Sequence, residues 1–155
     1  MEIIADPVQT LQGEAIKRII AAGVFESSAI QRENTLAPDV LPYCRVTVPQ
    51  GGDFAFESQT AMSKTVIVEF DVMTSTLSST QTARQLASKI EAAFGLFSRS
   101  EKARVIELPG WSGVSAVVSQ WGRGSASVES EKGLYYLPVL LYVNLRISAG
   151  AKYEI

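Results

Sequence analysis

Two carboxylates lie close together in one predicted strand of the sequence. Glu69 and Asp71 fall in segment 64–73, where apolar and other residues alternate. Side chains two residues apart on a strand project from the same face, so the two carboxylates share one. Such a pair can bind a metal ion or carry out acid–base catalysis. The sequence marks no third ligand. We therefore interpret the pair as a solvated or interface-facing polar edge, and keep a small metal-dependent enzyme as an alternative.

The sequence offers few other residues suited to catalysis. The chain has no histidine, and its single cysteine, Cys44, lies among strand residues, where we expect a small buried side chain. Gly122, Arg123 and Gly124 superficially suggest a phosphate-binding loop, but no lysine followed by Ser or Thr completes that motif. We expect the tip of a hairpin there. The sequence predicts no enzyme, no metal and no cofactor.

The charge of the chain is low and unevenly distributed. A net charge of −2 argues against a dedicated nucleic-acid binder. Residues 1–60 carry 4 basic and 8 acidic side chains, whereas residues 61–155 carry 10 basic and 8 acidic ones. Arg99 and Lys102 belong to a basic stretch after the second predicted helix. It is either a docking patch or a solvated surface with cations near a helix C-terminus.

The composition indicates a surface that is partly covered. Only 19% of the residues are charged and 46% are hydrophobic. Phe54, Phe56 and Trp111 stand in predicted loops, where they either pack on their own core or anchor a subunit contact. With Arg99, Lys102 and Arg123 they are our candidate contact residues.

The hydropathy pattern predicts a single α+β domain over residues 1–155. Amphipathic helices are expected over 7–22 and 80–94, packed on one side of a sheet in which antiparallel pairs prevail. The expected strands are 41–48, 64–73, 104–108, 114–121 and 134–147, and the loops or inserts are 25–40, 49–63 and 122–133. The apolar run 134–143 is too short to span a bilayer, and no leader precedes the first helix, so we expect synthesis in the cytoplasm and no membrane.

The order of these segments resembles the tail terminator and tail-completion (neck) proteins of long-tailed bacteriophages. The resemblance covers about residues 7–147. It rests on Leu41-Pro42-Tyr43, on the strand Val66-Ile67-Val68-Glu69-Phe70-Asp71-Val72, on an Ala-rich helix over 82–94 that follows a Thr/Ser-rich turn, and on a long terminal strand. The inserts at 50–63 and 122–133 are longer than the family pattern suggests.

The resemblance implies a structural virion protein without catalytic activity. Its expected form is a hexameric ring that caps the tail tube and joins it to the head–tail connector, with the tail sheath as a further neighbour. DNA would pass through the lumen only as cargo, which favours acidic or neutral walls. The loop acids that fit such a lining are Asp53, Glu57, Glu129 and Glu131. Another ring component, either a connector or a tube subunit, is the first alternative, and a monomeric ligand-binding module is another.

Overall fold

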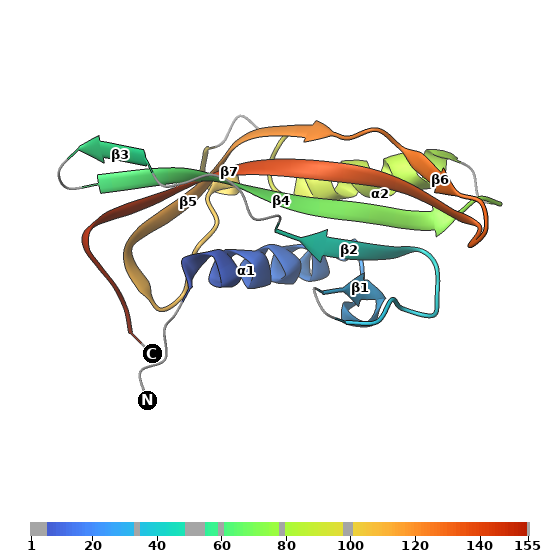
Figure 1. The fold of residues 1–155 in the computed structure, drawn as a ribbon, viewed down its shortest axis with the longest axis horizontal. Coiled ribbons are helices and arrows are strands. Elements are labelled where there is room, and N and C mark those ends of the chain that lie inside the picture. The colour runs from blue at the N-terminus through green and yellow to red at the C-terminus, as the bar shows by residue number, and fades with distance from the viewer. Residues whose placement is uncertain are drawn as a thin grey trace.

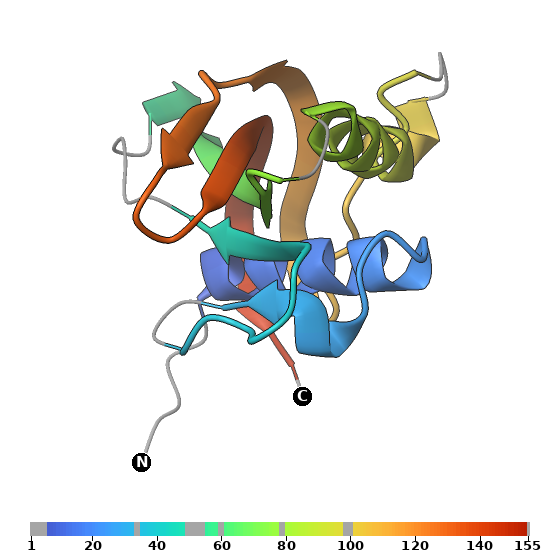
Figure 2. The same ribbon diagram turned by 90° about the vertical axis from the view of Figure 1, so that its right-hand side faces the viewer.

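The computed structural model describes residues 6–32, 35–48, 55–58, 61–77, 80–97 and 101–154, with only the backbone described for 55–58. A long sheet with two helices against it forms the domain (Figures 1 and 2). The helices are α1 (Pro7–Ala21) and α2 (Thr80–Ala93), with 3-10 turns η1 (Ser27–Ala29) and η2 (Glu101–Arg104). The strands are β1 (Ile30–Gln31), β2 (Tyr43–Thr47), β3 (Ala55–Ser58), β4 (Ala61–Ser75), β5 (Trp111–Arg123), β6 (Ser127–Glu129) and β7 (Leu134–Tyr153).

Both predicted helices are confirmed to within one residue at each end. Asp6 caps α1, because its Oδ1 accepts a hydrogen bond of 2.9 Å from the backbone N–H of Val8, and Pro7 follows in the first turn. The apolar stripe of α1 is buried at Leu11, Ala15, Ile16 and Ile19, and that of α2 at Ala83, Ala87 and Ile90. None of the helices in the part of the chain that the structure describes is long and apolar enough to cross a membrane.

The sheet is built around two long strands. Its order is β1-β2-β4-β7-β5, with β3 also pairing with β4 and β6 with β7. All 15 residues of β4 pair antiparallel with β7, from Ala61 opposite Ser148 to Ser75 opposite Leu134. Among the strands that the structure describes, the short β1–β2 pair is the one parallel pair. The α+β class with a mostly antiparallel sheet is therefore confirmed.

One face of the sheet and the two helices enclose the core. Alternate residues of β4 and β7 point into it, and Phe70 of β4 meets Phe94, just beyond α2, with ring centroids 5.6 Å apart. The remaining core residues of β4 and β7 are Val66, Val68, Val72, Leu137, Val139, Leu141, Val143 and Leu145, and β1, β2 and β5 add Ile30, Cys44, Val46, Ala116 and Val118. Alternation fixes the other set of side chains, including Glu69 and Asp71, on the opposite face.

Four of the segments predicted from the sequence need correction. Segment 104–108 is not a strand, because Arg104 ends η2 and only Val105 forms a bridge, to Val117. The predicted tip 122–133 contains the end of β5 and the short strand β6, which pairs with the first residues of β7. The predicted inserts 25–40 and 49–63 likewise contain β1 and β3. These short strands form because a longer neighbour supplies their hydrogen-bond partners.

Candidate functional site

The carboxylate pair predicted on β4 is part of an ion pair with β2. Asp71 is 1% exposed and lies opposite Arg45 in the β2–β4 register. Arg45 donates two hydrogen bonds to Oδ2 of Asp71, from Nε at 3.0 Å and from Nη2 at 2.8 Å. The Oδ1 atom is buried and has no hydrogen-bond donor among the described residues. Arg45 therefore supplies the counter-charge of Asp71, through Oδ2 alone.

Glu69 lies on the same face, half-buried. Burial, and then the charge of Asp71, raise the pKa of the Glu69 carboxyl above its ordinary value, and Arg45 only partly offsets this. Within the described ranges, no cluster of three or more Asp, Glu, Cys or His side chains could hold a metal ion. This geometry supports a structural ion pair between Arg45 and Asp71, next to a Glu69 carboxyl of raised pKa, better than it supports a metal centre.

Cys44 is fully buried in β2. Burial, with a smaller contribution from Asp71, raises the pKa of its thiol far above the ordinary value, so the thiol stays protonated at neutral pH. The expected small buried side chain is confirmed.

Arg123 is engaged within its own chain. From the end of β5 its Nη2 donates to Oε1 of Glu91 at 2.6 Å and to Oγ of Ser88 at 3.0 Å, both on α2. Glu91 is 5% exposed, a burial that the sequence analysis missed. The signal was present, because Glu91 continues the buried row Ala83–Ala87 at intervals of four residues.

Trp111, the first residue of β5, also packs inside the subunit. Its Nε1 donates to Oγ1 of Thr10 on α1 at 3.1 Å, and its ring lies 5.2 Å from that of Tyr153. The indole is half-buried, so a contact with another subunit would involve only its remaining surface. That contact stays a prediction.

Some of the other candidate residues are exposed, and the rest lie outside the described residues or are described by backbone alone. Lys102 in η2 is exposed, and so are Glu129 in β6 and Glu131 in the following turn. Lys132 Nζ lies 3.9 Å from Oε2 of Glu129. Three candidates (Asp53, Phe54 and Arg99) lie outside the described residues, and only the backbone of Phe56 and Glu57 is described, in β3.

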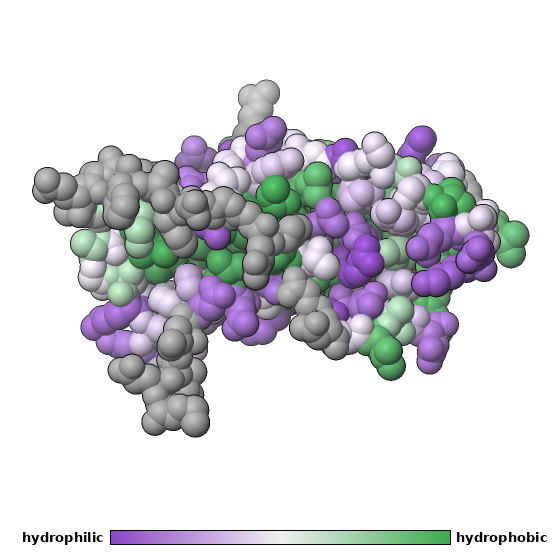
Figure 3. Space-filling view, in the orientation of Figure 1, coloured by the Kyte–Doolittle hydropathy of each residue, from purple (hydrophilic) through white to green (hydrophobic). Residues whose placement is uncertain are grey.

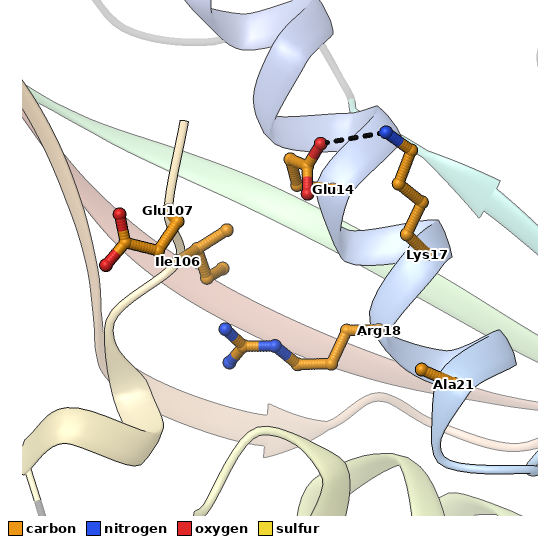
Figure 4. Close-up of a pocket in the computed structure, with 6 residues that line it drawn as sticks. All are labelled: Glu14, Lys17, Arg18, Ala21, Ile106 and Glu107. Carbon is orange, nitrogen blue, oxygen red and sulfur yellow. Dashed lines mark hydrogen bonds and ion pairs between the residues drawn. The ribbon is translucent and has the colours of Figure 1, made fainter. Parts of the chain in front are cut away.

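A shallow hollow of about 290 Å³ lies between α1 and segment 106–107 (Figure 4). The guanidinium of Arg18, one of its two cationic groups, donates to the carbonyls of Ala103 at 3.0 Å and Val105 at 2.8 Å, and it lies over the Phe94 ring. Glu14 is paired with Lys17 at 3.1 Å. With Arg18, Glu14 and Lys17 engaged, Glu107 is the remaining charged residue of the lining.

One end of the sheet exposes large apolar side chains that the sequence analysis did not single out. They come from the residues that lead into β2, the turn after β4, and β6, and we call them the apolar end: Leu41 (41% exposed), Leu77 (97%) and Val128 (58%). Leu36 (94%) and Val40 (62%) are exposed in the segment before them. The backbone N–H of Thr76 donates to the carbonyl of Gly133 at 2.9 Å, which joins the turn after β4 to the β6–β7 turn. This end faces the viewer in Figure 2, and Figure 3 shows hydrophobic and hydrophilic groups side by side there.

Comparisons with known proteins bear on the fold alone. No protein-family model matches the chain. No curated protein matches it either. One solved structure, known only by a sequence identifier, superposes with a TM-score of 0.58 at 14% identity, over 89% of this chain and 94% of its own. The chain is thus similar in fold to a protein whose name gives no function.

Proposed function

We propose that the chain is a structural subunit of a long-tailed phage virion: a tail terminator whose ring caps the tail tube and joins it to the neck. The proposed assembly is a homohexamer that contacts the tube protein, the head–tail connector and the sheath. DNA passes through its lumen, with Glu129 and Glu131 among the candidate lining residues. It needs no cofactor and turns over no substrate.

The apolar end is the observation that carries this proposal. Large apolar side chains grouped on a soluble surface are typical of sites that another protein covers. Leu77 and Val128, at 97% and 58% exposed, lie largely outside the packing of their own subunit. Their exposure supports a function in assembly, since burying them against a partner would remove this apolar area from water.

The arrangement of the elements supports the family resemblance further. Residues 41–43 lead into β2, residues 66–72 form the centre of β4, residues 82–93 form most of α2, and β7 is the long terminal strand. The two helices pack on one side of the sheet, as the resemblance implies. The metal-dependent alternative has less support, because Arg45 already neutralises Asp71 at 2.8 Å.

A measurement of mass and shape tests the proposal. We would determine the molar mass by light scattering behind a sizing column and image the peak by negative stain. Six copies of the 16.8 kDa chain weigh about 101 kDa, and a closed ring of that mass is the expected result. The ring would then be mixed with purified phage tail tubes, where it should bind at one end and stop further growth.

Other outcomes of this experiment favour the alternatives. Open stacks of rings that lengthen with concentration would replace the terminator with a tube subunit. A particle of 16.8 kDa at every concentration, with or without tubes, would favour the ligand-binding module and contradict the proposal.

A further inference from the structure

Two exposed surfaces of the subunit differ in charge as well as in position. The first is the apolar end. The segments that form it or lead directly into it (39–42, 76–77 and 127–133) carry three acidic side chains, Asp39, Glu129 and Glu131, against one basic side chain, Lys132, which pairs with Glu129. Asp39 and Glu131 are exposed and form no ion pair with another described residue. This end is therefore apolar with an acidic rim.

The second surface lies on the side of the molecule, where α2 ends and η2 follows. We call Lys89, Phe97, Lys102 and Arg104 the basic surface. Phe97 is 67% exposed, Lys89 and Lys102 are exposed, and Arg104 is half-buried. Glu101 is the one acid between Phe97 and Arg104 in the described residues. The three cations form no ion pair elsewhere in the part of the chain that is described.

The fold holds the basic surface together. The turn after α2 and η2 lie in contact, because a Cβ on Gly95 would meet the Cβ of Ala103. The guanidinium of Arg18 fixes η2 from the other side through the carbonyl of Ala103 at 3.0 Å. In Figure 2, with the apolar end toward the viewer, α2 and η2 lie at its flank.

We propose that the apolar end of one subunit docks on the basic surface of a second copy of this chain, with Leu77 and Val128 against Phe97 and with Glu131 and Asp39 facing Lys102 and Lys89. The inference rests on the proposed function, since it names the contact that closes the ring. It also assigns Glu131 to a subunit contact rather than to the lumen.

Charge and geometry together favour a second copy as the partner. An acidic rim meets a basic surface, and each surface centres on exposed apolar side chains. The two surfaces are therefore complementary in charge and can bury apolar area against each other. One patch meets a different patch, which is a heterologous contact. Because one patch is at an end and the other on a flank, each contact turns the next subunit, and the assembly is a ring where these rotations close and an open filament where they do not.

Reciprocal charge reversal tests which surfaces meet. In Glu131→Lys and in Lys102→Glu, an attraction becomes a repulsion, so each variant should raise the concentration for half-assembly by roughly fivefold or more at low salt. The double variant E131K/K102E should return it to within about twofold of wild type. Glu154→Lys, an exposed acid at the opposite end of β7, is the matched control and should assemble as wild type does. Sedimentation velocity gives the assembled fraction.

Cross-linking tests the direction of the contact. Cys44 is fully buried, so cysteines introduced as V128C and K102C are the accessible thiols for a flexible bismaleimide. A chain that carries both should give a ladder of oligomers, because each end is joined to the next flank. V128C alone should give almost no cross-linked product, and Leu77→Asp in the double-cysteine chain should abolish the ladder.

The outcomes separate this contact from the function. Rings that form normally in L77D and in both charge reversals would overturn the contact and leave the terminator proposal standing. Efficient dimers from V128C alone would overturn it in favour of a symmetric end-to-end contact. Open filaments that dissociate in L77D would support the contact and overturn the terminator. A V128C/K102C chain with no other change that gives no ladder at any concentration would overturn the contact itself.

Discussion

The guanidinium of Arg123, at the end of β5, lies 2.6 Å from Oε1 of Glu91 on α2, whose side chain is only 6% exposed. Ser88 Oγ accepts a further hydrogen bond from the same group. This relationship joins an edge strand of the sheet to the helix that packs across it. Since the nearly buried carboxylate depends on one cation, the interaction stabilises the position of α2 and is sensitive to loss of either partner.

Replacing Arg123 should destabilise the fold. In Arg123→Ala, Glu91 keeps its burial and loses its cation, and we expect a loss of about 2 kcal/mol in the free energy of unfolding. Urea denaturation measures this loss. Adding Glu91→Gln to R123A should recover part of it, because the amide carries no charge. Equal stability of R123A and wild type would show that water replaces the arginine.

Arg45 should matter for a similar reason on the opposite face of the sheet. Arg45→Met leaves Asp71 buried, with neither of its hydrogen bonds to the guanidinium, at an expected cost of about 2–3 kcal/mol. The double variant R45M/D71N removes the charge as well and should lie closer to wild type. Urea melts of the two variants and of D71N alone complete the cycle. Additive effects of the two changes would contradict the pairing.

Glu69 should make stability depend on pH. Its folded-state pKa is raised above the ordinary 4.5, so folding favours the protonated form. The stability from this group is complete below about pH 4.5 and is lost as pH rises through the folded pKa. Glu69→Gln lacks this loss and should melt at a higher temperature than wild type at pH 7. The melting temperatures of the two proteins should converge toward pH 4, and a constant difference across this range would exclude the effect.

Two glycines form a matched test of backbone strain and steric overlap. Gly23 and Gly95 both have positive φ values, 72° and 69°, which alanine adopts at a cost of about 1–2 kcal/mol. A Cβ on Gly23 meets no atom within 4 Å, whereas one on Gly95 would overlap Ala103. Gly95→Ala should therefore lower the midpoint of urea denaturation clearly more than Gly23→Ala. Equal midpoints would mean that η2 shifts away freely.

Local signals predicted the elements with the strongest patterns. Asp6, Pro7 and the apolar stripe identify α1 from sequence, and strict alternation identifies the centre of β4. The segment after Ile147 has small residues (Ser148, Ala149 and Gly150) with low strand propensity, yet β7 continues to Tyr153 because β5 pairs beside it. The prediction for segment 104–108 was wrong in the opposite sense. Its composition favours a strand, but Arg104 ends a 3-10 turn and Val105 forms only a single bridge.

The candidate surfaces were harder to predict than the elements. Leu77 and Val128 are isolated apolar residues in polar segments, and nothing in the sequence places them together. The fold alone does so, through the contact between the turn after β4 and the turn before β7. Trp111 shows the converse: from sequence, an aromatic residue after a Pro-Gly turn either packs on its own core or anchors a contact, and in the structure its indole N–H is bound to Thr10 across the domain.

The pairing of β4 with β7 has a consequence for how the protein is made. Ser75 pairs with Leu134 and Ala61 with Ser148, so the two central strands come from opposite halves of the chain. During synthesis β4 leaves the ribosome long before β7, with one face apolar and with the backbone edge that pairs with β7 still unpaired. Such late, long-range pairing slows folding and exposes the nascent chain to aggregation. High-level expression should therefore gain from slower translation or from chaperones that hold the first half until β7 emerges.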